Sequence, residues 1–551
     1  MYEWLYRWEE QYPDLVDVYQ VAESFEGRPI LQATVTNEST GPASDKPGAF
    51  FEGGRHSGEV TSSESVLWLM KYVLDNYGSD PEITQLLDTR ALYLRPKNNP
   101  DGSGLYLHTA QSNRSTNRPM DNDGDGLLDE DAADDLNEDR VIHQMRNKPR
   151  TRTDDRATHV LDESDASGRL MRRAAAGEEA IWVVSREGID NDGDGRVDED
   201  GIGGLDLHRN YVENWRPMPG REMTGRGYTQ GGAGAFPLSE IETRSVVVFL
   251  LENPNISIAN SMDTRVPMHL RAPSTSPGQE RMYPEDLAIY EHFDSVGKAI
   301  TGYPWAGDVF HHYSTRSRPD AEPMDGRPLF GHGPDFGYWY YGAIWYGDEL
   351  WDGGRFPDLN GDGEENQADA LIWDDAENNG LAFKEWETFE HPTLGEVEIG
   401  GFHPKFFSQN SPPAALEEWA GNQALFNLAM AMELPLLEMV DVEVSGAETT
   451  GDDTTYDVEV TWRNAGGIPT ALRQARLVKV VREDQAVLAF EGSEASVVGP
   501  SSVNSGWSDP GETNSATFKV RVSGNDPVEG TVQILSTRGG VLKHRFTVGG
   551  N

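Results

Sequence analysis

The hydrophobic pattern of this 551-residue chain changes near residue 436, and that change limits the fold more than any single motif does. Before it, strand-like segments such as Ile30 to Thr36, Ala49 to Glu52 and Ile256 to Ala259 alternate with segments of helical periodicity. After it, short alternating segments are separated by Gly, Asn, Asp, Ser and Pro turns. The pattern therefore predicts an α/β domain with helices on the faces of a sheet over residues 1–435, and an all-β sandwich of about seven strands over residues 436–551.

The charge balance and the absence of cysteine narrow the chemistry. Asp and Glu number 93 against 46 Lys and Arg, and because phosphate binding needs clustered basic side chains, nucleic acid is not an expected partner. Without cysteine there are no disulfides, no thiolate metal ligands and no thiol nucleophile. The apolar run Val246 to Leu251 is far shorter than the roughly 20 residues that a membrane helix needs, so no membrane span is expected. The net charge of -47 fixes no oligomeric state.

Three acidic loops have the spacing of calcium sites. They run from Asp121 to Asp131, from Asp190 to Asp200 and from Asp358 to Asp369, as insertions within the α/β domain (about 120–131, 190–200 and 358–369). Each has glycine at position 6, where a chain wrapped around a hard cation must turn sharply. Since crowded carboxylates repel one another without a cation, the spacing predicts structural Ca²⁺; solvated acidic turns are the alternative. The predicted ligands are Asp121, Asp123, Asp125, Asp129, Asp131, Asp190, Asp192, Asp194, Asp198, Asp200, Asp358, Asn360, Asp362 and Asp369.

The predicted calcium sites also indicate where the protein is located. Loops tuned to millimolar calcium suit an extracellular setting, so we expect a secreted or periplasmic protein. The first residues, MYEWLYRWEEQYPDL, lack the basic and apolar regions of a signal peptide, so we expect that such a segment was removed or never existed.

A candidate metal site lies in the segment FEGGRHSGEVTSSES, where a predicted strand ends and a predicted helix begins. His56 and Glu59, three residues apart at such a turn, can face one cation, and nitrogen and oxygen ligands suit zinc. Four further segments support this interpretation. They are NNPDG at 98–102, QMR ending at Arg146, LDLHRNY at 205–211 and YGDELW around Glu349.

Together with YPDLVDVYQVAESFEGRPI and GAFPLSEIET, these segments resemble the zinc carboxypeptidases, the carboxypeptidase A-like metallopeptidases, co-linearly over about residues 1–435. The DNDGDG loop directly before LDLHRNY resembles a bacterial branch of that family. The resemblance implies a carboxypeptidase-like mixed sheet flanked by helices. It also implies a metallocarboxypeptidase that hydrolyses the last peptide bond of peptide or protein C-termini.

The resemblance also implies residue roles. His56 and Glu59 are implied zinc ligands, and Glu349 is the implied general base. Arg146 is implied to hold the scissile carbonyl, and Arg209 the C-terminal carboxylate of the substrate, with His208 and Asn210 beside it. Such a site is chemically coherent, because zinc acidifies water, a carboxylate takes the proton and an arginine steadies the oxyanion.

Three positions depart from the family pattern. Asp263 stands where the third zinc ligand is a histidine; an aspartate can ligate zinc, which leaves the metal less electrophilic. The alternatives to Asp263 as third ligand are His269, His311 and His312. His208 replaces an asparagine, and the substrate-capping tyrosine falls near Arg327, for which Tyr313 is a possible replacement.

The sequence leaves alternatives open both for the side-chain specificity and for the type of activity. Neutral Pro334 at the predicted base of the side-chain pocket disfavours Lys or Arg substrates, and Phe336, Tyr338, Trp339 and Tyr341 either line that pocket or belong to the core. The alternatives to a peptidase are a catalytically weakened binding protein for peptide C-termini and an amidase acting on cell-wall peptides.

Overall fold

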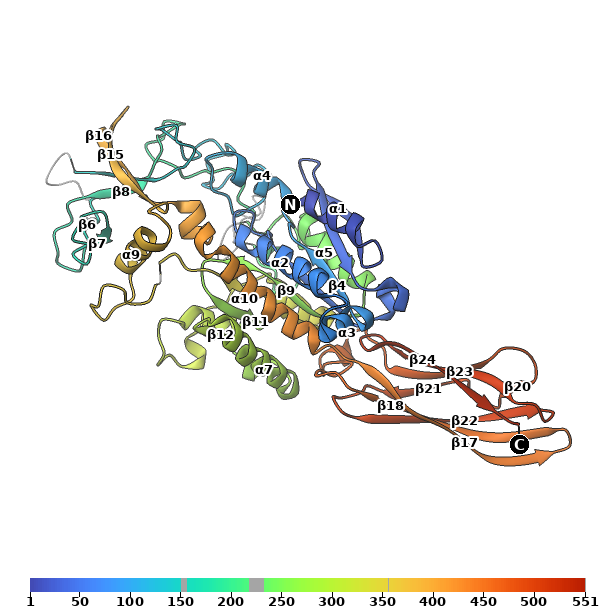
Figure 1. The fold of residues 1–551 in the computed structure, drawn as a ribbon. Helices are drawn as coiled ribbons and strands as arrows, with labels where there is room; N and C mark the ends of the chain where they lie inside the picture. Colours follow the sequence, from blue (N-terminus) through green and yellow to red (C-terminus); the bar gives the residue numbers. More distant parts are fainter. Residues whose placement is uncertain (150–155, 218–231, 355, 551) are drawn as a thin grey trace.

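The computed structural model describes residues 1–149, 156–217, 232–354 and 356–550 (Figure 1). A helical and sheet region forms the body of the molecule, and a C-terminal β region extends from one end of it (Figure 1). Among the described residues, no helix combines the length and apolarity needed to cross a membrane.

The body is organised around one mixed sheet, whose order is β1-β2-β4-β3-β9-β13-β11-β14-β10, with β12 paired to β11. The predicted strands near residues 30, 49, 91 and 256 are confirmed as β2, β3, β4 and β9 of this sheet. Its strands are β1 (Val16–Glu23), β2 (Pro29–Val35), β3 (Gly48–Glu52), β4 (Ala91–Arg95), β9 (Ile256–Ser261), β10 (Asp263–Thr264), β11 (Met268–Arg271), β12 (Trp305–Asp308), β13 (Ile344–Tyr346) and β14 (Glu349–Leu350).

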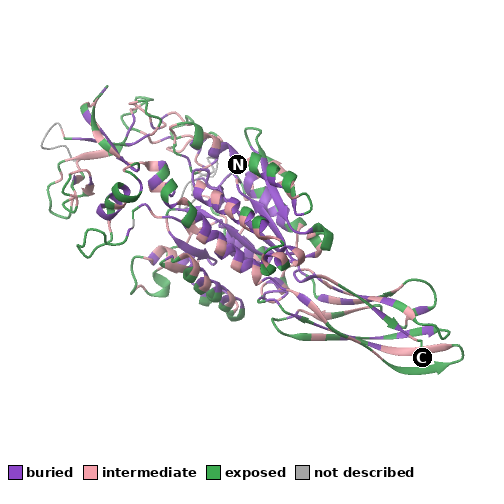
Figure 2. Cartoon of the chain, in the orientation of Figure 1, coloured by how far each residue is buried: buried purple, intermediate pink, exposed green. Residues whose placement is uncertain are grey.

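Both faces of the central strands are buried beneath helices. Along β3, Ala49 and Phe51 belong to the core under α2, α7 and α10, whereas Phe50 faces the opposite core with α5. The buried residues accordingly run through the middle of the body, and exposed residues collect on its outer loops (Figure 2). The body's longer helices are α1 (Tyr2–Gln11), α2 (Val60–Asn76), α3 (Pro81–Thr89), α4 (Pro100–His108), α5 (Ile241–Glu252), α7 (Pro284–Thr301), α9 (Gln367–Glu377) and α10 (Pro413–Met432).

A second, smaller sheet lies at the end of the body remote from the C-terminal region (Figure 1). Its order is β15-β16-β5-β8, so two insertions far apart in sequence build it jointly. The strands are β5 (Gln144–Asn147), β8 (Val183–Arg186), β15 (Phe383–His391) and β16 (Gly395–Phe402), and the hairpin of β6 (His159–Leu161) and β7 (Met171–Arg173) accompanies them.

The C-terminal region consists of two four-stranded antiparallel sheets, β17-β18-β22-β20 and β21-β19-β23-β24. Residues from both sheets, including Trp462 and Ile534, form one shared core, as expected of a sandwich. The segment between β18 and β19 instead joins the core of the body through Ile468, Leu472 and Val481. The strands are β17 (Leu437–Thr450), β18 (Asp453–Asn464), β19 (Asp484–Phe490), β20 (Ala495–Val497), β21 (Ser502–Gly506), β22 (Thr513–Ser523), β23 (Val528–Ser536) and β24 (Gly540–Val548).

Candidate metal centre

Two neighbouring parallel strands bring the first candidate ligands together. His56 follows β3, and Asp263 follows its sheet neighbour β9, so both lie at the carboxyl ends of these strands. Gly53 is required at the end of β3 because a Cβ there would lie 2.6 Å from the backbone oxygen of Ser62 in α2. This close approach of strand and helix keeps His56 and Glu59 on one tight turn.

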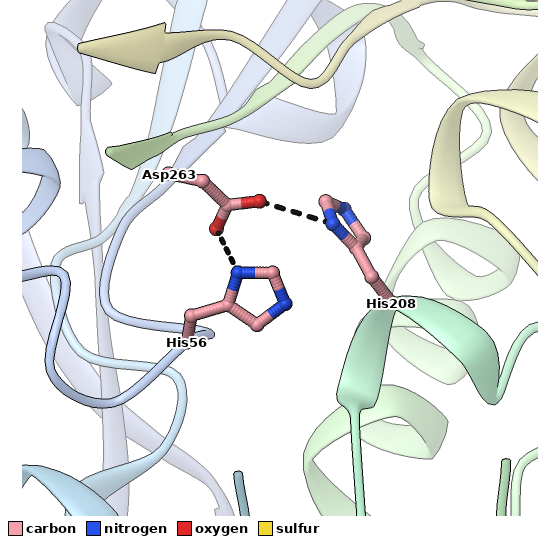
Figure 3. A group of neighbouring side chains, drawn as sticks. All are labelled: His56, His208 and Asp263. Carbon is pink, nitrogen blue, oxygen red and sulfur yellow. Dashed lines mark ion pairs between the residues drawn. The ribbon is translucent and has the colours of Figure 1, made fainter. Parts of the chain in front are cut away.

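The two nitrogens of the His56 ring face different groups. Nδ1 lies 3.1 Å from Asp263 Oδ1 and 3.3 Å from Glu59 Oε2 (Figure 3 shows the first contact). Nε2 lies 3.0 Å from Asp206 Oδ1. An outer carboxylate on one ring nitrogen is the usual way to orient a histidine whose other nitrogen binds a metal.

The two carboxylates are held by arginines through their remaining oxygens. Arg114 contacts Glu59 Oε1 at 2.8 Å, and the buried Arg55 contacts Asp263 Oδ2 at 2.9 Å. The inner oxygen Asp263 Oδ1 is buried and accepts no hydrogen bond from the described residues. Donor atoms bound tetrahedrally to one Zn²⁺ lie about 3.3 Å apart. The residues therefore fit zinc, with His56 Nδ1, Glu59 Oε2 and Asp263 Oδ1 as donors.

The electrostatics favour a cation at this point. Burial and Arg114 oppose a positive charge on His56, yet the carboxylates of Asp263, Glu59 and Asp206 outweigh them and raise its pKa to about 10. A centre that favours a proton on the imidazole this strongly has the surplus of negative charge that a divalent cation needs.

His208 lies on the other side of Asp263 (Figure 3). Its Nδ1 is 3.0 Å from Asp263 Oδ2, while its buried Nε2 has no hydrogen-bond partner among the described residues. Burial and Arg55 hold the pKa of His208 well below its usual range, so the ring is neutral and one nitrogen keeps a lone pair. Donor atoms of His56, His208 and Asp263 all lie within 4.8 Å of one another.

A cavity of about 510 Å³ opens beside this group and is lined by Glu349, Tyr313 and Arg209 as well as by Glu59 and Asp263. Glu349 pairs in register with Asp263 through the parallel strands β14 and β10, which explains their proximity. Burial raises the pKa of Glu349 to about 8, and the Glu59 and Asp263 carboxylates act in the same direction. The Glu349 charge in turn raises the pKa of Tyr313 to about 12, with burial contributing.

Arg146 is a correction to the predicted site. It lies on β5 of the smaller sheet, where Nε donates to Glu398 at 2.7 Å and the guanidinium packs against the rings of Trp182 and Trp386. It does not line the cavity, because β5 belongs to the second sheet and not to the strand ends that hold His56. The arginines that contact the candidate ligands are Arg55 and Arg114, and of these two Arg114 lines the cavity.

Asn210 is a second correction. Its amide nitrogen donates to the carbonyls of Ala233 and Phe236 and to Ser239, and its oxygen accepts from the backbone of Glu240. The side chain therefore holds the loop before α5 and does not line the cavity.

The substitute histidines are not at the metal centre either. His269 is buried between Asp348 and Thr301, at 3.0 Å from each. His312 contacts Asp308 at 3.3 Å, and neither it nor His311 lines the cavity.

The residues predicted to form the pocket for the substrate side chain also lie elsewhere. Pro334 and the aromatic residues that follow it do not line the cavity. Tyr338 donates to Asp286 at 2.9 Å and Tyr341 to the carbonyl of Asn253 at 2.7 Å, so the core explanation holds for these two. The aliphatic side chains that line the cavity are Val266, Leu270, Val309 and Leu329.

Three functional candidates were missing from the sequence prediction. Arg114 follows NNPDG by twelve residues, and Asp206 lies inside LDLHRNY, so both were within reach of the motifs. Asp206 Oδ1 also accepts the backbone N–H of His208 at 2.8 Å, which ties the two halves of the site together. Arg55 precedes His56 directly, but nothing in the sequence indicates its contact with Asp263.

The first two acidic loops lie against each other. Asp131 and Asp200 form an antiparallel bridge, Asn122 donates to Asp200 at 2.9 Å, and Asn191 donates to Asp131 at 3.0 Å. The predicted sharp turns at position 6 are confirmed by φ values of 101° at Gly126 and 94° at Gly195. Oxygens of Glu130 and Glu199, which the sequence prediction omitted, join three-member groups such as Asp123, Asp125 and Glu130.

The remaining predicted calcium ligands differ in their surroundings. Asp129 is anchored by backbone N–H groups of Met120 and Gly203. Burial, with Asp131 and Asp134 nearby, raises the pKa of Asp198 to about 7. In the third loop, Asp358 accepts from the backbone of Gly361 and Gly363.

Asp369 differs from the other predicted ligands, because it caps α9. Its two oxygens accept N–H groups of Leu359, Asn360 and Asn366. They are therefore less available to a cation.

Comparison with known protein families shows that residues 1–301 match the zinc carboxypeptidase family. Residues 436–547 match a separate domain family of unknown function. Carboxypeptidase A2 of Mus musculus is 38% identical over 102 residues, which are 18% of this chain and 22% of that protein. Carboxypeptidase A1 of Mus musculus is 35% identical over 104 residues, 19% of this chain and 23% of that protein. The chain thus spans less than a quarter of the length of these relatives.

The crystal structure of thrombin activatable fibrinolysis inhibitor superposes with a TM-score of 0.42 at 16% identity, covering 78% of this chain and 74% of that chain. Because the family profile matches more than half of the sequence, the chain belongs to the zinc carboxypeptidase family.

Proposed function

We propose that the protein is a zinc-dependent metallocarboxypeptidase that hydrolyses the last peptide bond of peptides. The observation that carries the proposal is the convergence of His56 Nδ1, Glu59 Oε2 and Asp263 Oδ1 at 3.1 and 3.3 Å, in a cavity shared with Glu349 and Arg209. When bound there, Zn²⁺ supplies a Lewis acid that polarises a carbonyl and activates water.

The chain's own residues supply the remaining functions. Arg209 binds the substrate's C-terminal carboxylate, since its guanidinium lines the cavity and its backbone is fixed in the turn capped by Asp206. Glu349 accepts the proton of the attacking water and passes it to the leaving amine; its pKa is raised by burial and by the Glu59 and Asp263 carboxylates, whose charge a bound cation would offset. Arg114 donates to the scissile carbonyl and to the oxyanion that forms from it.

Metal content tests the first step of this proposal. Purified without chelator, the parent protein is expected to hold about one zinc per chain, and His56→Ala almost none, because the remaining carboxylates lose their nitrogen partner. Elemental analysis measures both, with the exposed His544→Ala on β24 as the matched control. Equal zinc in parent and His56→Ala would contradict the assignment.

One observation favours a second candidate, a weakened peptidase retained as a binding protein for peptide C-termini. Asp263 shares its Oδ2 between Arg55 and His208, which reduces the electron density that it offers to a metal. This candidate is favoured if the protein lacks zinc but binds peptides through Arg209.

We further propose that the paired acidic loops bind structural Ca²⁺, with the third loop as a separate site. Support comes from the carboxylates of Asp121, Asp123 and Asp200, whose oxygens lie within 4.8 Å of one another across the two loops. Loops of this kind suit millimolar calcium, so we also propose an extracellular or periplasmic location, which cell fractionation would test.

Removal of calcium is expected to lower Tm by about 3–5 °C, because a ligand that binds only the folded state stabilises it by mass action. Scanning calorimetry in chelator, followed by return of Ca²⁺ alone or Zn²⁺ alone, separates the two metals. Asp123→Asn is expected to blunt the response to Ca²⁺, whereas exposed Asp17→Asn on β1 serves as control. An unchanged Tm in chelator would contradict the proposal that these loops bind calcium.

A further inference from the structure

A second cavity of about 490 Å³ adjoins the one beside the metal centre. The two share part of their lining, including Ser112, Arg186, Arg265 and Gln409. The smaller sheet forms one wall of the second cavity through residues such as Val184 and Trp386, so the insertions that build this sheet extend the groove beyond the site where hydrolysis would occur.

The second cavity is lined by positively charged side chains, although the chain as a whole is strongly negative. Carboxylates outnumber basic side chains 93 to 46 overall, yet the described residues lining the second cavity include no Asp or Glu. Its ionic side chains are Arg169, Arg186 and Arg265, accompanied by His143 and His159, whose pKa values burial lowers. The arginines therefore set the charge of this wall at neutral pH.

Two of the three arginines are available to a ligand. Arg169 is already paired with Asp375 at 2.8 Å. The side chains of Arg186 and Arg265 are exposed, and neither lies within ion-pair distance of a carboxylate in the described part of the chain, although Arg186 is close enough to Asp198 to oppose the rise of its pKa. Arg265 also has a φ of 98°, a backbone conformation that non-glycine residues adopt rarely and that concentrates at functional sites.

The position of these arginines relative to the cavity beside the metal centre indicates which part of a bound peptide they would contact. Arg209 and Tyr313 line only the cavity beside the metal centre, whereas Arg186 and Arg265 lie at its junction with the second cavity. A peptide whose terminal carboxylate is held by Arg209 must leave the site at another point, and this junction continues the groove. The residues that precede the scissile bond would then pass Arg186 and Arg265.

We propose that this protein prefers peptides with acidic residues immediately before the scissile bond, bound by Arg186 and Arg265 in the second cavity. This inference rests on the proposed carboxypeptidase function for the direction of the peptide. Guanidinium groups pair with carboxylates in bidentate geometry, and no Asp or Glu among the described residues lines the second cavity to compete with a bound peptide there.

The test compares two N-acetylated tetrapeptides, one with three Glu and one with three Gln before a common C-terminal Phe. Kd is measured calorimetrically on zinc-loaded Glu349→Gln full-length protein, and kcat/KM on the zinc-loaded parent. The Glu peptide is expected to bind about tenfold more tightly at low salt, with the advantage shrinking as ionic strength rises. Arg186→Gln with Arg265→Gln is expected to bring the two Kd values within about twofold.

Arg173→Gln is the matched control, because Arg173 is exposed on the nearby strand β7 and lines neither cavity. Equal Kd values for both peptides, or an advantage for the Glu peptide that survives the double substitution, would overturn this inference. Tighter binding of the Glu peptide without turnover of either peptide by the parent would instead contradict the proposed enzymatic function and leave the preference standing.

Discussion

Replacing Glu349 with Gln is expected to lower kcat for peptide hydrolysis by about 10³-fold, the range expected when a general base is removed. The amide keeps the size of the side chain but cannot accept the proton of the attacking water. Its backbone pairing with Asp263 is unaffected by the substitution, so the candidate metal ligands should stay in place. Steady-state kinetics on a C-terminal peptide bond and elemental analysis for zinc measure the two effects together.

The zinc content of Glu349→Gln distinguishes two explanations of a lost activity. Unchanged zinc with lost turnover supports a role in proton transfer, whereas lost zinc would mean that Glu349 helps to hold the metal. Full activity in a folded, zinc-loaded Glu349→Gln would refute the general-base assignment and would favour a protein without this chemistry.

Arg114→Ala is expected to lower kcat by about 10²-fold to 10³-fold, the cost of losing one donor to an oxyanion. Arg146→Ala is expected to leave kcat within about twofold, since Arg146 packs between Trp182 and Trp386 in the smaller sheet and does not line the cavity. The pair is a matched comparison, because each substitution removes one guanidinium from an ion pair. Kinetics on the same peptide, with circular dichroism to establish folding, measure the difference.

Arg114 also contacts Glu59 and Asp206, at 2.8 and 3.3 Å, so its loss can act through the metal ligands. Zinc analysis separates that route from the loss of a donor to the oxyanion. A larger loss of kcat in Arg146→Ala than in Arg114→Ala would restore the role that the sequence motif implied for Arg146.

The sequence by itself determined the features that depend on short stretches of chain. His56, Glu59 and the turn between β3 and α2 lie within a dozen residues, and the buried strands carry continuous apolar runs that only a covered sheet accommodates. The glycines at position 6 of the acidic loops likewise predict local backbone conformations, and φ at Gly126 and Gly195 agrees.

Tertiary structure decided which distant residues meet. Arg114 and Arg146 are equivalent as isolated basic residues, and only the separate sheet under Arg146 removes it from the site. The bridge between Asp131 and Asp200 and the contact of Arg55 with Asp263 join residues more than 60 positions apart, and the second cavity gathers side chains from several separate segments. No local pattern encodes such contacts, because the packing of whole sheets and insertions fixes them.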